Sequence, residues 1–193
     1  MFERFDDNAR QVVHNAQAVA RRLHHDYVGT EHLIIALAKS DKSVSQAALL
    51  GQQYTSEALL EQIKVGHAEP PRDLPFTPRA KKVLEQSLRQ AIARKSMSIT
   101  DADLLLGILH PKDDNAAVEM LKKIGGPNAV ASLREAVFRH LDSTGTTVPE
   151  DGDDLIKRIN DSLAALTADE LREVLCLVEL PQSERQERMK PSH

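Results

Sequence analysis

The chain has 193 residues, with 25 Lys and Arg against 29 Asp and Glu, and a formal net charge of −4. This near balance argues against nucleic acid or an anionic membrane as the main partner, because both select for a basic face. The single cysteine, Cys176, excludes an intrachain disulfide and a cysteine-based zinc site. No apolar run has the length of a signal or a membrane span, so we expect a cytoplasmic protein. Aromatic residues make up only 3% of a chain rich in Ala and Leu, which favours an all-α fold.

An internal repeat organises the chain before any single helix is considered. An offset of 71 residues places FDDNARQVV, which begins at Phe5, over FTPRAKKVL, which begins at Phe76. The same offset places HLIIAL over DLLLGI, and the apolar positions keep step without a gap. Such self-similarity indicates a duplicated unit. We expect one domain over residues 1–141, with repeats at 1–66 and 76–141 and a Pro-rich surface linker at 67–75.

Each repeat is predicted to contain four helices. In the first repeat, one apolar stripe at helical spacing comprises Val12, Val13, Ala16, Val19, Ala20 and Leu23. The apolar block after Thr30 predicts a second helix, with Thr30 as its N-cap and Glu31 at the positive end of the helix dipole. A third helix is predicted over residues 44–50 and a fourth over residues 56–65.

The second repeat is predicted to follow the same order. Its first helix opens at Thr77-Pro78, an N-cap followed by proline at the position where a missing N–H has no cost. The second helix is predicted after Thr100, which caps it, and the third and fourth are predicted over residues 115–124 and 127–141.

Beyond the repeats, DSTGTTVPEDGD predicts a flexible linker at residues 142–152. A small helical tail is expected over residues 153–180, where Thr167 and Glu170 form a capping box. Cys176 lies inside an apolar stretch of this tail and is expected to pack there. Residues 181–193 should be frayed.

Motifs for catalysis are missing from the sequence. It contains no G-x-x-x-x-G-K-[ST], G-x-G-x-x-G, G-x-S-x-G or H-E-x-x-H. Of the eight histidines, His24 and His25 are adjacent and so point to different faces of a helix, and the other six have no partner at i+3 or i+4. Because zinc needs converging ligands, we expect no metal site, no cofactor and no enzymatic activity.

The start of the second helix, Gly29-Thr30-Glu31-His32, has two interpretations. A capped helix start with a favourable acidic residue explains it structurally. A helix N-terminus also binds anions through its free N–H groups, and a neighbouring carboxylate could grip a guanidinium. A site that offers both would fit a phosphorylated arginine, and the residues alone leave both interpretations open.

Taken together, MFERFDDNARQVV, VGTEHLIIAL, PFTPRAKKVLEQSLRQA and the repeat resemble the N-terminal domain of Clp AAA+ unfoldases, closest to the ClpC type, over residues 1–141. Residues 142–193 resemble nothing recognised, and the large ATPase modules are missing. The chain therefore resembles a stand-alone Clp repeat protein that kept the substrate-reading domain and lost the motor. The resemblance implies a pseudo-two-fold bundle of eight helices that receives substrates and adaptor proteins for the Clp protease.

The resemblance also implies specific sites. ClpC-type domains bind phosphoarginine, a degradation mark, at two equivalent sites, where the Glu of each GTEH motif holds the guanidinium and the helix start holds the phosphate. The first site would comprise Thr30, Glu31 and His32. The second would comprise Thr100, Asp101 and Asp103. Because Ala102 stands where the first repeat has Glu31, the second site is either lost or rebuilt on its aspartates.

Similar domains are also targets of antibacterial cyclic peptides, which bind near an N-terminal Phe and the Phe of FTPRAKK. The matching residues are Phe2 and Phe76, with Lys81 nearby. On the residues alone, Phe76 would be the hydrophobic staple of the helix that Thr77 caps.

We therefore expect a non-enzymatic binding protein that recognises phosphoarginine-marked proteins, degrons or cyclic peptides and modulates or buffers the ClpC unfoldase. An alternative is a regulator or adaptor that docks on a Clp unfoldase or its adaptors by surface mimicry, with the tail supplying the contact. A phosphoarginine phosphatase lacks a nucleophile–base pair or a metal motif in the sequence.

Overall fold

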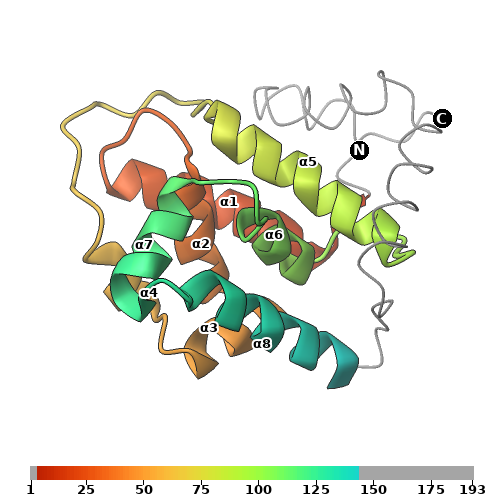
Figure 1. Cartoon of the computed structure of the whole chain (residues 1–193). Helices are drawn as coiled ribbons and strands as arrows, with labels where there is room; N and C mark the ends of the chain where they lie inside the picture. The colour runs from red at the N-terminus through yellow and green to blue at the C-terminus, as the bar shows by residue number, and fades with distance from the viewer. Residues whose placement is uncertain (1–3, 144–193) are drawn as a thin grey trace, which may run out of the picture.

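The computed structural model describes residues 4–143, which fold into α-helices without an extended strand (Figure 1). The all-α prediction is confirmed for this part of the chain. The predicted tail, most of its linker, and Phe2 lie outside the described residues. In chain order the helices are α1 (Asp7–Arg22), α2 (Thr30–Ala38), α3 (Val44–Gly51), α4 (Ser56–Leu60), α5 (Pro78–Ala93), α6 (Asp101–Ile108), α7 (Ala116–Gly125) and α8 (Ala129–Ser143).

The long amphipathic helices α1 and α5 open the two repeats in the same way. The Asp6 side chain accepts a hydrogen bond from the backbone N–H of Ala9 at 2.7 Å. The Thr77 hydroxyl accepts one from Ala80 at 3.1 Å, with proline next in the chain as predicted. A short polar acceptor satisfies N–H groups that have no partner inside the helix, which fixes both starts 71 residues apart.

The short helices α2 and α6 are buried on all sides. Their segments TEHLIIALA and DADLLLGI are apolar around the whole circumference after the first turn, which is typical of a core helix. They lie between the layer of α1 and α5 and the layer of α3 and α8 (Figure 1). Gly107 lets α6 approach α5 closely, since a Cβ there would lie 2.7 Å from both the Ser87 Oγ and the Val83 carbonyl oxygen.

The gapless alignment of the repeats is wrong after the second helix. The N-caps of α3 and α7 are Ser43 and Asn115, which are 72 residues apart (115 − 43). At the predicted offset of 71, the buried Ala48 would correspond to the exposed Glu119; at 72 it corresponds to the buried Met120. One extra residue in the second repeat's loop keeps the apolar face of α7 toward the core.

The two repeats share one core rather than forming separate bundles. Helix α3 packs against α8, and α7 packs against α2 and α4. The same interlocking is visible in the caps: the Thr30 hydroxyl accepts from the Ala117 N–H at 3.3 Å. In the other direction, the Asp101 carboxylate accepts from the Ser45 N–H at 2.7 Å and from its hydroxyl at 2.6 Å. Each second helix thus caps the third helix of the other repeat.

The fourth helix of the first repeat ends at Leu60, five residues before the predicted end. The chain beyond it crosses the C-terminal end of α1, where the Gly66 N–H donates to the Leu23 carbonyl at 2.7 Å and the Ala68 N–H to the His24 carbonyl at 3.1 Å. These bonds require an extended chain, so tertiary contacts override the helical pattern. The other predicted helix bounds are correct to within two residues. No helix between residues 4 and 143 is long and apolar enough to span a membrane.

Candidate functional site

The start of α2 is built differently from the prediction. Its N-cap is Gly29, and Thr30 is the first helical residue, so the N-cap assignment of Thr30 is wrong. Because Gly29 has no side chain, the helix start relies on the third helical residue: the Gly29 N–H donates to Nδ1 of His32 at 2.9 Å. This is one half of a capping box, with an imidazole in place of the usual carboxylate.

A hydrogen-bonded histidine pair continues from this cap. Nε2 of His32 lies 2.8 Å from Nδ1 of His25, and Nε2 of His25 lies 3.0 Å from the Lys64 carbonyl oxygen. The Gly29 N–H makes Nδ1 of His32 an acceptor, so with both rings neutral each Nε2 carries the proton and donates onward. The relay runs from Gly29 through the two imidazoles to Lys64 and ties the start of α2 to the segment that follows α4.

The environment of His32 keeps its ring uncharged. The side chain is fully buried, and burial, followed by the neighbouring His25, lowers the pKa of His32 to about 3. A second proton would have to go on Nδ1, directly facing the Gly29 N–H. His32 therefore positions the helix start and contributes no positive charge to a bound phosphate.

Glu31 is the acidic group of the predicted first site, and it is held close to the backbone. The residue is 9% exposed, and one carboxylate oxygen lies 3.8 Å from Nδ1 of His32. The carboxylate folds over Gly29: a Cβ at that position would lie 2.5 Å from the Glu31 Cδ and closer still to its oxygens. Burial first, and then the charges of Glu31 and Asp26 and a hydrogen bond with Glu31, raise the pKa of Tyr27 above its ordinary value.

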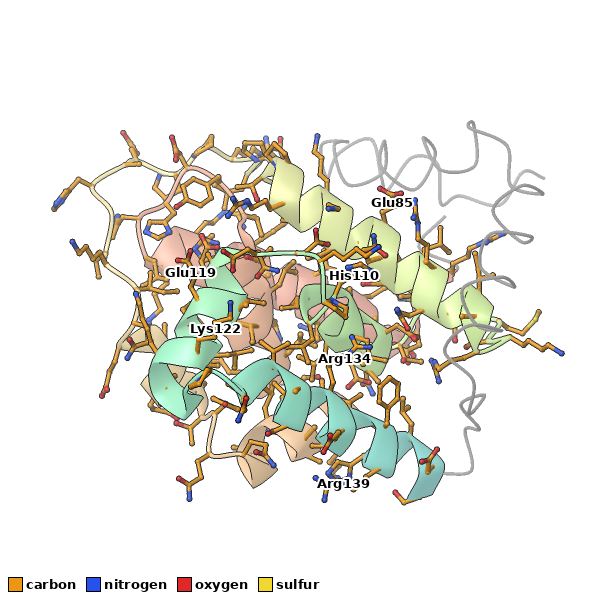
Figure 2. The ribbon with its side chains drawn as sticks, in the orientation of Figure 1. Glu85, His110, Glu119, Lys122, Arg134 and Arg139 are labelled. Atoms are coloured by element: carbon orange, nitrogen blue, oxygen red, sulfur yellow. The ribbon has the colours of Figure 1, made fainter. Side chains whose placement is uncertain are left out.

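A pocket of about 540 Å³ opens beside Glu31. Its walls are residues 24–27 of the α1–α2 loop, residues 62–68 after α4, and one side of α7. The α7 residues that line it are Ala116, Glu119, Met120 and Lys123. Glu119 lies near the N-terminal end of α7, above Lys122 in the view of Figure 2.

The pocket carries both signs of charge together with apolar surface. Asp26, Glu31 and Glu119 are acidic, and Lys64 and Lys123 are basic. The rings of Tyr27 and His25 stack at 5.4 Å between centroids on the loop side, and Ile63 and Met120 add apolar contact. Such a lining suits an elongated ligand that has both a cationic and an anionic group.

The predicted second site is already filled by the chain itself. The Arg94 guanidinium donates to both oxygens of Asp103, at 2.9 and 2.7 Å, and the two side chains are 3% and 0% exposed. Asp103 also accepts from the N–H and the hydroxyl of Thr100, both at 2.9 Å. Thr100 caps α6 as predicted. The remaining aspartate, Asp101, is bound to Ser45, and Ala102 is buried.

Of the three residues of the predicted cyclic-peptide site, Phe2 lies outside the described residues. Phe76 is only 5% exposed and belongs to the common core. It is not a staple, because the fourth helical residue of α5 is Lys81, which is not apolar. Phe76 instead pairs with Val28 in a short parallel bridge, with the Thr77 N–H donating to the Val28 carbonyl at 2.9 Å.

Contrary to the prediction from histidine spacing, three possible metal ligands converge across the α1–α2 loop. His25, Glu31 and His32 place ligand atoms within 4.8 Å of one another. The hydrogen bonds oppose metal binding, however, because a neutral ligating histidine carries its proton on the other nitrogen. Ligation through Nε2 of His32 would set that proton against the Gly29 N–H. The pair is better assigned to the relay.

Two groups that shape these sites, His25 and Arg94, were not predicted from the sequence. His25 lies seven residues before His32, a spacing without meaning on one helix, and it reaches His32 because the loop between α1 and α2 folds back. Arg94 lies nine residues before Asp103 in no recognisable motif. Arg94 could have been predicted from Asp103, an aspartate directly before the apolar run of a core helix, because a buried carboxylate needs a partner.

The sequence profile of the Clp repeat (R) N-terminal domain matches residues 4–124. The chain is 34% identical over 152 residues to the chaperone protein ClpC2, chloroplastic, of Oryza sativa subsp. japonica, which covers 77% of this chain and 16% of that protein. It is 32% identical over 120 residues to the ATP-dependent Clp protease ATP-binding subunit ClpC of Staphylococcus epidermidis, covering 61% and 15%. The chain thus spans about one sixth of the length of these relatives.

Solved structures with a similar fold include two N-terminal domains. One is that of the caseinolytic protease associated chaperone ClpD from Arabidopsis thaliana, with a TM-score of 0.58 and 22% identity over 74% of this chain and 97% of that one. The other is the Hsp104 N-terminal domain from Candida albicans, with a TM-score of 0.62 and 16% identity over 76% and 95%. At these identities the likeness supports the fold alone.

Proposed function

Because the chain belongs to the Clp repeat (R) N-terminal domain family, we propose that it is a non-enzymatic recognition module of the Clp system that binds phosphoarginine-marked proteins. Binding would use the pocket at the start of α2 and would modulate or buffer a ClpC-type unfoldase. The observation that carries the proposal is the Glu31 carboxylate, held at the edge of a pocket that also contains lysines.

The guanidinium and the phosphoryl group of phosphoarginine, which an N–P bond joins, both have matching groups in this pocket. A guanidinium would bind Glu31, because carboxylates recognise it through charge-assisted hydrogen bonds. Lys64 and Lys123 line the same pocket and supply positive charge for the phosphoryl group. Apolar surface from Tyr27 and Met120 would cover the methylene stem that joins the guanidinium to the ligand's backbone.

Only the first site is proposed. In the second repeat, the position of Glu31 is taken by Ala102, and Asp103 is saturated by Arg94 and Thr100. Opening that site would break a buried ion pair, which is costly. We therefore expect one phosphoarginine per chain rather than two.

Isothermal titration calorimetry with free phosphoarginine tests the proposal. The chain should bind one equivalent, and Glu31→Gln should weaken binding by about tenfold or more, because a hydrogen bond to a charged group is worth about 1.5–3 kcal/mol. Glu135→Gln on α8, an exposed glutamate that does not line the pocket, is the matched control and should bind as the wild type does.

Separate titrations with arginine and with inorganic phosphate show which group of the ligand is recognised, the guanidinium or the phosphoryl group. Both should bind more weakly than phosphoarginine. Absence of binding by the wild-type chain, or equal binding by Glu31→Gln, would refute the proposal.

The alternative of docking on a Clp unfoldase through the C-terminal helices depends on residues 153–180, outside the described part. The cyclic-peptide site at Phe2, Phe76 and Lys81 likewise stays a prediction.

A further inference from the structure

We infer that Gly29 is the positioning residue of the site: its missing side chain makes the space that the Glu31 carboxylate occupies, so the two positions work as one unit. This inference rests on the proposed role of Glu31 as the guanidinium-binding group. It assigns to Gly29 a function that its place in a helix-start motif does not reveal.

Backbone conformation does not explain the glycine. Gly29 has φ −102° and ψ 178°, extended values that any residue adopts. The second repeat provides the comparison within the same chain, because Thr100 is the N-cap of α6 with φ −99° and ψ 170°. A threonine is therefore compatible with this backbone, and it supplies a capping hydroxyl that glycine lacks.

The close approach of the Glu31 carboxylate explains why position 29 is a glycine. A Cβ at position 29 would lie 2.5 Å from the Glu31 Cδ, well inside van der Waals contact. The carboxylate is the end of a flexible side chain, so a substitution at Gly29 would rotate it away rather than break the fold. The second repeat changes both positions together: Thr100 replaces the glycine, and Ala102 replaces the glutamate that would meet the threonine side chain.

The position of the Glu31 carboxylate can be followed without a ligand through the pKa of Tyr27. Tyr27 hydrogen bonds with Glu31 and feels its charge, both of which raise the pKa of the phenol. Moving the carboxylate away should lower that pKa. The chain has two tyrosines and no tryptophan, so Tyr54→Phe leaves Tyr27 as the only source of the tyrosinate absorbance.

The experiment compares Gly29→Ala, Glu31→Gln and the double variant in the Tyr54→Phe background, by tyrosinate absorbance against pH. Circular dichroism at each pH restricts the titration to the folded range. Both single variants should lower the pKa of Tyr27, and the double variant should show no further shift than Glu31→Gln alone. Gly51→Ala is the matched control, because a Cβ there meets nothing within 4 Å.

Calorimetry with phosphoarginine gives the second readout. Gly29→Ala should lose as much affinity as Glu31→Gln while its melting temperature falls by only a few degrees, because alanine is a weaker N-cap than glycine. Gly51→Ala should bind normally. An unchanged Tyr27 titration in Gly29→Ala, shifts that add in the double variant, or wild-type affinity in Gly29→Ala would overturn the inference. If the wild type does not bind phosphoarginine, the proposed function fails, and the Tyr27 titration still decides whether Gly29 positions Glu31.

Discussion

Acidification should destabilise this protein through His32, and His32→Gln should remove part of that sensitivity. The folded state holds the pKa of His32 at about 3, whereas the ordinary pKa of an exposed histidine is 6.5. Between pH 6.5 and pH 3, His32 therefore binds a proton in the unfolded chain but not in the folded chain. Because the unfolded state binds more protons, stability from this group falls as the pH falls from about 6.5 toward 3.

The size of the effect follows from the pKa difference. A pH of 5 lies 1.5 units below the pKa of the unfolded side chain (6.5 − 5), and each unit is worth about 1.36 kcal/mol. The free energy of unfolding should therefore fall by about 2 kcal/mol between pH 7 and pH 5. Glutamine at position 32 does not titrate, and its carbonyl oxygen can accept from the Gly29 N–H as a capping-box residue does.

Urea unfolding at pH 7 and pH 5, followed by far-ultraviolet circular dichroism, measures the loss for both proteins. All other titrating groups are shared, so the wild type should lose about 2 kcal/mol more than His32→Gln. The control His14→Gln, at an exposed position on α1, should behave as the wild type does. Equal losses in the wild type and in His32→Gln would show that the ring becomes protonated in the fold and that the relay is not rigid.

Three further substitutions test the packing that closes the second site and joins α5 to α6. Arg94→Met should cost about 3–5 kcal/mol, because it leaves Asp103 buried without its cation, and Arg94→Met/Asp103→Asn should cost less than the sum of the single changes in urea unfolding. Gly107→Ala should lower the melting temperature, since overpacking against the Val83 carbonyl costs about 1–3 kcal/mol and exceeds the roughly 1 kcal/mol gained in helix propensity. Additive costs for the first pair, or a melting temperature for Gly107→Ala that is not lowered, would show that these contacts are looser than described.

Local sequence signals predicted the fold well because they depend on neighbouring residues. The caps at Thr77 and Thr100 rely on a side chain and an N–H three residues away, and both are found as predicted. The uniformly apolar blocks after Thr30 and after Thr100 become the buried helices α2 and α6 for the same reason. The prediction failed at Thr30, where a hydroxyl that could cap its own helix caps α7 instead.

Sequence by itself determined the duplicated all-α architecture, the family, and Glu31 as the candidate recognition residue, because periodicity, capping and motif spacing are written in short stretches of chain. Only the tertiary structure decided what the two helix starts can do. Contacts between distant residues place Lys64 and α7 around Glu31 and supply Arg94 to Asp103, and no local pattern encodes either. The Glu31 carboxylate of the first repeat borders an open pocket, whereas the Asp103 carboxylate of the second repeat forms a buried ion pair with Arg94.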